Sequence, residues 1–417
     1  MLHSRRSFLR ASAMLAALPL TGKMAFADIG GVNEKIDLLL QNAVAAGDIP
    51  GAAVALTNAS GTYYSGAFGT RDAETGAPIG PDTVMAIASM TKPITSVAVM
   101  QLVERGALDL DEPVSNVLPE LASIQVLAGY DASGKAILRD PATPPTLRQL
   151  LTHTSGFTYP MWNADLGRYY QTYNVPSILV GTRDAFKVPL SFDPGTQWEY
   201  GIGIDWAGLV VEAVTGVRLG DYLKEHVTGP LGMTSTDFKV SENMARRLSK
   251  IYARDADGNL VAAPIGSPDA QAIDAGGSGL HSTLNDYLKF VRMILNKGSL
   301  DGQRILAPET IALMSQNNIG DLRVKELKTV MPPMTRDAEF YPGVPKTWGL
   351  GFMITEAQAP TGRTAGSLSW SGLFNTYFWI DPARDVAGVM MMQIMPFVDE
   401  RALQTYYDFE TAAYASL

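Results

Sequence analysis

The order of apolar and polar positions predicts strands near both ends of the chain and helices between them. Residues 33–47 place apolar side chains at helical spacing and end near a glycine. Two short apolar runs, 51–56 and 61–68, are separated by turn-forming residues and predict a hairpin. A second helical pattern runs from Ser89 to Gly106, so the first hundred residues combine helix and sheet.

The rest of the chain changes from a helical pattern to a mixed one. Helical patterns lie at 146–151, 205–215, 219–226, 282–296 and 398–415. Strand-like runs lie at 348–355, 373–380 and 386–394. We therefore predict an α/β fold with an antiparallel sheet flanked by N- and C-terminal helices. Residues 28–106 and 246–417 would form the α/β domain, and 107–245 an inserted all-helical domain.

Composition narrows the class of protein. The chain has 417 residues, of which 46% are hydrophobic and 18% charged, as expected of a globular protein. Its formal charge of −9 and the lack of a Lys/Arg cluster argue against nucleic acid as a partner. Cysteine is absent, which excludes thiol catalysis, zinc–thiolate sites and disulfides.

The first residues have the pattern of a targeting segment. Ser4-Arg5-Arg6-Ser7-Phe8-Leu9-Arg10 is a twin-arginine pattern, and Ala25-Phe26-Ala27 offers the small residues that a signal peptidase recognises. A membrane anchor is the alternative, but the apolar run between them is shorter than the roughly 20 residues that span a bilayer. We expect a signal peptide at 1–27 and a periplasmic or secreted mature protein without membrane attachment.

Ser89-Met90-Thr91-Lys92 is the central chemical signal. Residues three apart on a helix share a face, so the Lys92 ammonium can reach the Ser89 hydroxyl. A serine hydroxyl becomes a good nucleophile when a neighbouring base removes its proton, and a desolvated lysine can assist. For this motif alone, a helix-capping serine and a solvated lysine would be the simpler interpretation. Here the motif lies between an apolar run and an apolar helix.

With this motif the chain resembles the penicillin-recognising serine enzymes, which include class C β-lactamases, D-stereospecific peptidases and family VIII carboxylesterases. The resemblance covers essentially the mature chain. Three further segments carry it: Leu-Leu-Thr-His-Thr-Ser-Gly-Phe at 150–157, Asp-Pro-Gly-Thr-Gln-Trp-Glu-Tyr at 193–200 and Gly-Gly-Ser-Gly-Leu-His-Ser-Thr at 276–283. It implies that Tyr200 joins Ser89 and Lys92 as a catalytic residue, acting as general base and then as general acid.

Two departures from the family pattern indicate a subfamily. β-Lactamases and D,D-peptidases usually carry Tyr-x-Asn and Lys-Thr-Gly, whereas this chain has Ile202 and Trp370-Ser371-Gly372 at the matching places. The exchanges remove an amide donor and a cation, so a substrate carboxylate would be costly to bury. The pattern resembles carboxylesterases and related acyltransferases. We expect Ile202, Trp370, Ser371 and Gly372 to contact substrate.

The resemblance also implies an oxyanion hole formed by the backbone N–H groups of Ser89 and Leu373. Aromatic residues follow the 150–157 segment, and we expect Phe157 and Tyr159 to line the substrate pocket with others of this group. The predicted activity is that of a carboxylesterase, or an acyltransferase, on small to medium esters. Its partner would be a small-molecule ester or amide, and no cofactor is expected.

Several competing interpretations remain open. A Ser-His-Asp triad is one alternative, but the chain has no G-x-S-x-G motif. His153 is more simply explained as a residue that packs and forms a hydrogen bond with the backbone. No His/Asp/Glu cluster has metal-ligand spacing, so we predict no metal. A D-stereospecific peptidase or amidase would need a charged site for a free terminus, for which Arg363 is the candidate. A β-lactamase of the same superfamily is a further alternative, which the departures at Ile202 and Trp370 disfavour. A non-catalytic binding module is the last one, and the presence of Ser89, Lys92 and Tyr200 together argues against it.

Overall fold

The computed structural model describes residues 29–263, 272–415 and 417, so the predicted signal peptide at 1–27 lies outside the described residues. The largest sheet contains β1 (Gly51–Thr57), β2 (Thr62–Asp72), β3 (Ala77–Pro78), β12 (Lys346–Trp348), β13 (Met353–Thr355), β14 (Leu368–Gly372), β15 (Thr376–Asp381) and β16 (Val386–Met391). Its eight strands run in the order β12-β13-β14-β15-β16-β1-β2-β3, and every neighbouring pair is antiparallel. The predicted antiparallel sheet and the 51–68 hairpin are confirmed.

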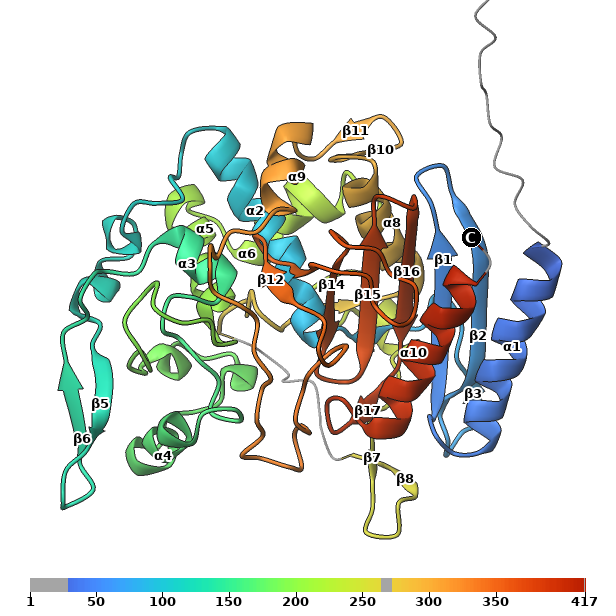
Figure 1. Ribbon diagram of the computed structural model, residues 1–417, viewed down its shortest axis with the longest axis horizontal. Coiled ribbons are helices and arrows are strands. Elements are labelled where there is room, and N and C mark those ends of the chain that lie inside the picture. Colours follow the sequence, from blue (N-terminus) through green and yellow to red (C-terminus); the bar gives the residue numbers. More distant parts are fainter. Residues whose placement is uncertain (1–28, 264–271, 416) are drawn as a thin grey trace, which may run out of the picture.

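Helices from both ends of the chain flank this sheet. Helices α1 (Ile29–Ala45) and α10 (Glu400–Tyr414) pack against each other, whereas α8 (Leu284–Leu295) packs against β1, β15 and β16. Figure 1 shows α1 and α10 in front of the strands and α8 behind them. All residues of β1, β15 and β16 are buried, which explains their continuous apolar sequences. The predicted flanking helices are confirmed.

Two predicted strands differ from the structure. The run at 348–355 is the hairpin β12–β13, because the chain turns at Gly351, whose φ is +100°. A Cβ there would lie 2.5 Å from Ser96 Oγ, so only glycine fits. The run at 373–380 starts as a turn, in which Asn375 has a φ of +59°, and the strand begins only at Thr376.

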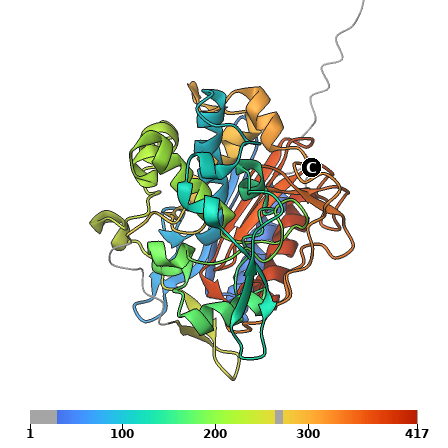
Figure 2. The ribbon, with the colours of Figure 1, turned by 90° about the vertical axis from the view of Figure 1, so that its left-hand side faces the viewer.

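The middle segment contains α3 (Leu147–Thr152), α4 (Ala164–Tyr173), α5 (Gly203–Thr215), α6 (Leu219–Leu223) and α7 (Glu242–Ala245), and also a hairpin of β5 (Val126–Tyr130) and β6 (Ala136–Arg139). The predicted helix at 219–226 is shorter, because α6 passes into a π-helical turn at Lys224–Thr228. Figure 2 shows this teal and green segment in front of the sheet. The domain boundaries at 106 and 246 remain a prediction.

The remaining elements complete the fold. They are β4 (Met85–Ala86), α2 (Thr91–Glu104), β7 (Tyr252–Arg254), β8 (Leu260–Ala262), β9 (His281–Ser282), β10 (Ser299–Leu300), β11 (Gln303–Arg304), α9 (Pro308–Met314) and β17 (Ile394–Met395). Among the helices of the described residues, none combines the length and apolar character that crossing a bilayer requires.

Candidate active site

Ser89 lies in a sharp turn between strand β4 and helix α2. Strand β4 pairs antiparallel with β9, which brings the glycine-rich segment before β9 beside the turn. Ala88 has a φ of +43°, a left-handed conformation that costs on the order of 1 kcal/mol for a non-glycine residue. A 3₁₀ turn at Ala88–Met90 follows, and α2 starts at Thr91 rather than at Ser89. Lys92 therefore lies in the first turn of α2, as predicted.

Lys92 is completely buried and makes three hydrogen bonds. Its Nζ is 3.2 Å from Ser89 Oγ, 3.1 Å from the Tyr159 hydroxyl and 2.7 Å from the Gly277 carbonyl. Burial lowers the pKa of Lys92 to about 7, and the negative charge of Asp205 opposes this shift. The amine and the ammonium are thus both accessible near neutral pH, which suits a group that takes up and releases a proton.

Tyr200 reaches the same place from the segment before α5. The 153–159 segment lies alongside it, because Tyr159 N–H donates to the Tyr200 carbonyl and Glu199 N–H to the His153 carbonyl. The indole Nε1–H of Trp370, on β14, donates to the Tyr200 hydroxyl at 2.9 Å. Lys92 Nζ lies 4.6 Å from the centre of the Tyr200 ring. The structure therefore brings Ser89, Lys92, Tyr200 and Trp370 together.

Burial sets the protonation of the two rings next to Lys92. It raises the pKa of the Tyr200 phenol, while interactions with Ser89 and Trp370 oppose the rise. Tyr200 is therefore a phenol at neutral pH and can donate a proton. Burial, followed by the charge of Lys92, holds the pKa of His153 well below its usual range. His153 is neutral, and its Nδ1 accepts from Gly201 N–H at 3.4 Å, in line with a structural role.

Asp205, in the first turn of α5, is a site residue that sequence reasoning missed. It is 1% exposed, and its Oδ1 accepts from the backbone N–H of Gly277 at 2.9 Å. Burial raises the Asp205 pKa, and the charge of Lys92 counteracts that rise. In the sequence, Asp205 looks like an ordinary acid at a helix N-terminus. Its five-residue separation from Tyr200 was the one signal that could have drawn attention to it.

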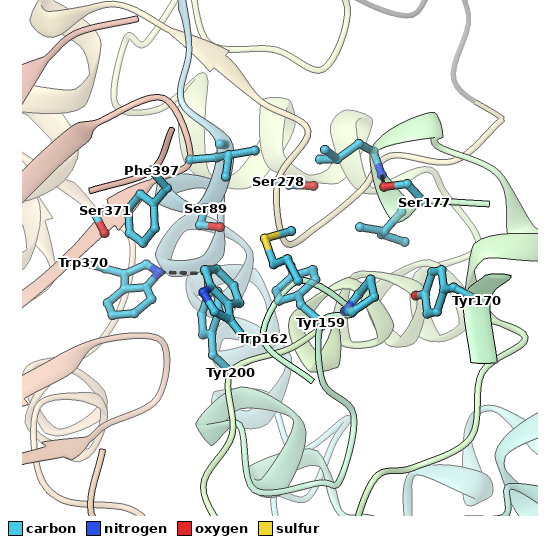
Figure 3. A pocket seen from close by; sticks show the side chains of 16 residues that line it. Ser89, Tyr159, Trp162, Tyr170, Ser177, Tyr200, Ser278, Trp370, Ser371 and Phe397 are labelled. Carbon is cyan, nitrogen blue, oxygen red and sulfur yellow. Dashed lines mark hydrogen bonds between the residues drawn. The ribbon is translucent and has the colours of Figure 1, made fainter. Parts of the chain in front are cut away.

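An apolar pocket opens beside Ser89 (Figure 3). Among the described residues, its lining contains no Asp, Glu, Lys, Arg or His, and a largely apolar and aromatic lining is typical of small-molecule sites. Ser89, Tyr159, Tyr200, Trp370, Ser371 and Leu373 line it together with further apolar residues, which include Met161, Trp162, Tyr170, Ile178, Leu179 and Phe397. Such a lining suits a neutral, largely apolar ligand.

Three residues expected at the substrate do not line this pocket. Phe157 is buried and stacks on Trp206, with ring centres 5.5 Å apart. Ile202 is fully buried immediately before α5, where the apolar core surrounds it. Gly372 serves close packing, because a Cβ there would lie 2.3 Å from the carbonyl oxygen of Ile87, two residues before Ser89.

Arg363 cannot serve as a site for a substrate carboxylate. It is 1% exposed, and its guanidinium makes two hydrogen bonds of 2.8 Å to the Glu410 carboxylate. This bidentate ion pair neutralises the Arg363 charge within the core. Within residues 29–263, 272–415 and 417, no three His, Asp or Glu side chains gather in a way that would hold a metal ion.

Comparison with known proteins agrees with this geometry. The family model described as Beta-lactamase matches residues 36–413. The monacolin J acid methylbutanoyltransferase of Aspergillus terreus is 32% identical over 91% of this chain and 95% of its own length. The lovastatin esterase of Penicillium rubens is 34% identical over 87% and 94%, respectively.

The fold is likewise shared with a solved structure. Unliganded simvastatin synthase from Aspergillus terreus superposes with a TM-score of 0.80 and 31% identity, over 92% of this chain and 98% of that chain. The family match spans nearly the whole described chain, and the relatives cover it at more than 30% identity. The chain therefore belongs to the β-lactamase family of enzymes, in which it is related to acyltransferases and esterases.

Proposed function

We propose that this protein is a carboxylesterase that forms an acyl-enzyme on Ser89. The observation that carries the proposal is the Ser89 hydroxyl 3.2 Å from the buried Lys92 amine, at the edge of a pocket whose described lining residues are all uncharged. A nucleophile beside a desolvated base is the arrangement that covalent acyl transfer needs. The substrate is a neutral ester with an apolar acyl or alcohol group.

The acylation step uses the protons already positioned at the site. Ser89 Oγ attacks the ester carbonyl carbon, and its proton moves to the neutral Lys92 amine. The tetrahedral oxyanion is stabilised by the backbone N–H groups of Ser89 and Leu373. When the bond to the alcohol oxygen breaks, that oxygen takes a proton from the Tyr200 phenol, and the neighbouring Lys92 ammonium then gives its proton to the Tyr200 phenolate.

Release of the acyl group reverses these proton movements. Water attacks the acyl carbon and loses a proton to the Tyr200–Lys92 pair, and Ser89 Oγ regains one as it departs. The Trp370 indole N–H supports Tyr200 throughout, because its hydrogen bond at 2.9 Å stabilises negative charge on the phenol oxygen. In this scheme Trp370 occupies the place where lactamases carry a lysine.

Ester turnover by the wild type and Ser89→Ala tests the proposal directly. We expect rapid cleavage of short p-nitrophenyl esters by the wild type, loss of this activity in the variant, and little cleavage of a chromogenic cephalosporin. Ser96→Ala is the matched control, since Ser96 is a fully buried serine on the same helix as Lys92. Inert esters together with rapid cleavage of the cephalosporin or a D-peptide would overturn the esterase assignment.

Acyl transfer to an alcohol is the second candidate. The relative named a methylbutanoyltransferase supports it, whereas the relative named an esterase, at similar identity, supports hydrolysis. A methylbutanoyl group is short, branched and apolar, which suits the aromatic and aliphatic lining of the pocket. Supplying a bulky alcohol together with a methylbutanoyl ester would distinguish the two activities. A new ester as the main product favours transferase, whereas free acid alone favours esterase.

A further inference from the structure

Asp205 is a buried carboxylate with an incomplete set of partners. Its Oδ1 accepts from Gly277 N–H, but its Oδ2 has no hydrogen-bond partner among the described residues. Leaving a buried carboxylate oxygen unpaired is costly, and a polar group kept at such a cost in a native core calls for an explanation. A neutral or apolar residue would satisfy the packing at the start of α5 at lower cost.

Gly277 links this carboxylate to Lys92. Its N–H donates to Asp205 and its carbonyl accepts from Lys92 Nζ at 2.7 Å. The neighbouring Gly276 carbonyl accepts from the Thr95 hydroxyl, also at 2.7 Å. The glycine pair is thus held between helices α2 and α5. A Cβ on Gly277 would lie 2.2 Å from Asp205 Oδ2, so the close approach of backbone and carboxylate requires glycine there.

In the part of the chain that the structure describes, the other groups that face Lys92 carry no charge that could replace that of Asp205. Ser89 comes from the 3₁₀ turn, Tyr159 and Tyr200 from the loops before α4 and α5, and all three are hydroxyls. His153, at the end of α3, is neutral because burial and Lys92 both disfavour its charged form. The Tyr159 hydroxyl accepts from Lys92 Nζ at 3.1 Å, and it is near enough to Asp205 to help lower the pKa of that carboxyl without forming a hydrogen bond to Oδ2.

We propose that Asp205 is a positioning residue for Lys92: its carboxylate holds the Gly277 carbonyl against the lysine and supplies the negative charge that balances the buried ammonium. The proposal rests on the acyl-transfer chemistry at Ser89. During acylation Lys92 becomes an ammonium in a buried site, and a fixed carboxylate on the far side of Gly277 stabilises that charge. The carboxylate itself touches neither Ser89 nor the substrate pocket.

The variant Asp205→Asn separates charge from position. Its amide oxygen can still accept from Gly277 N–H, but the negative charge is gone. Because the Asp205 charge raises the pKa of Lys92, its removal lowers that pKa, and the neutral amine persists to lower pH. We expect the acid limb of the kcat/KM profile for a p-nitrophenyl ester to move down by about one pH unit, as is typical of losing a nearby opposite charge.

Asp205→Glu and Asp286→Asn are the comparison variants. The Glu variant keeps the charge, so its acid limb should stay near that of the wild type even where its misplaced carboxylate lowers kcat. Asp286 is a buried carboxylate on α8 that accepts from Ser235 N–H at 2.7 Å, and its Asn variant should leave the profile in place. If Asp205→Asn does not fold, Asp205→Ser is measured instead, with the same expected shift.

The outcomes separate this proposal from the proposed function. An acid limb that is unmoved, or moved upward, in a folded Asp205→Asn or Asp205→Ser variant overturns the role of Asp205 while ester turnover by the wild type stands. A wild type without Ser89-dependent ester turnover overturns the proposed function itself. A downward shift that is absent from Asp205→Glu and Asp286→Asn supports the positioning role, because loss of packing alone would not move the limb.

Discussion

The hydrogen bond from Trp370 to Tyr200 allows a quantitative prediction for Trp370→Phe. The Trp370 side chain is buried, its Nε1–H lies 2.9 Å from the Tyr200 hydroxyl, and the two ring centres are 4.8 Å apart. Phenylalanine keeps an aromatic ring against Tyr200 but cannot donate a hydrogen bond. The substitution therefore removes one interaction at the proposed proton donor and leaves most of the apolar contact.

The size of the expected loss in kcat depends on the stage of the reaction at which Tyr200 becomes charged. A hydrogen bond between neutral groups contributes about 1 kcal/mol, and one to a charged group about 1.5–3 kcal/mol. Tyr200 is neutral before the reaction and becomes negative as it gives up its proton, so the Trp370 bond strengthens in the transition state. Losing that difference of about 1–2 kcal/mol should lower kcat roughly 5- to 30-fold.

The assay compares kcat on short p-nitrophenyl esters with thermal unfolding of the same preparations. Trp379→Phe is the matched control, because Trp379 is fully buried on the adjacent strand β15 and its Nε1 has no hydrogen-bond partner among the described residues. The control should lose stability without losing kcat per folded molecule. A change in kcat below about two-fold in a folded Trp370→Phe variant would refute the reasoning about transition-state charge.

Three further predictions concern other parts of the molecule. Because the Lys92 pKa is about 7, ester turnover should fall as the pH drops below 7 and the amine gains a proton. A kcat/KM profile measures this fall, and a flat profile from pH 5 to 8 would contradict the prediction. Glu410→Gln leaves the buried Arg363 charge unbalanced, so urea unfolding should show a loss of about 3–5 kcal/mol, with unchanged turnover per folded molecule as the check. Intact mass of exported protein should correspond to a chain starting at Asp28; retention of the preceding residues would exclude cleavage there.

The sequence predicted the parts of the site that depend on local geometry. Ser89 and Lys92 are three residues apart at a helix start, so their contact follows from helical spacing alone. The pairing of Tyr200 with Trp370 joins residues 170 positions apart, and only the resemblance to a known family indicated that both belong to one site. Apolar patterning also identified the central strands, because β15 and β16 are buried on both faces.

The missed features depend on close packing between distant segments. Asp205 and Gly277 meet across 72 positions, and neither residue type is unusual in its own local sequence. The turn at Gly351 interrupts a run that alternation alone reads as one strand, because its need for glycine comes from Ser96 on α2. Phe157 and Ile202 have the apolar character of pocket residues, but the direction of their side chains is set by core packing that a sequence pattern does not encode.

The uncharged lining of the pocket also affects how a catalytic cycle ends. Under the proposed chemistry a neutral ester enters, but hydrolysis yields a carboxylic acid that ionises at neutral pH. No charged side chain among the described residues lines the pocket, so the carboxylate product gains no ion pair from them and loses hydration if it stays. The pocket therefore binds the ester and rejects the ionised acid, which makes product release favourable and limits inhibition by accumulated acid.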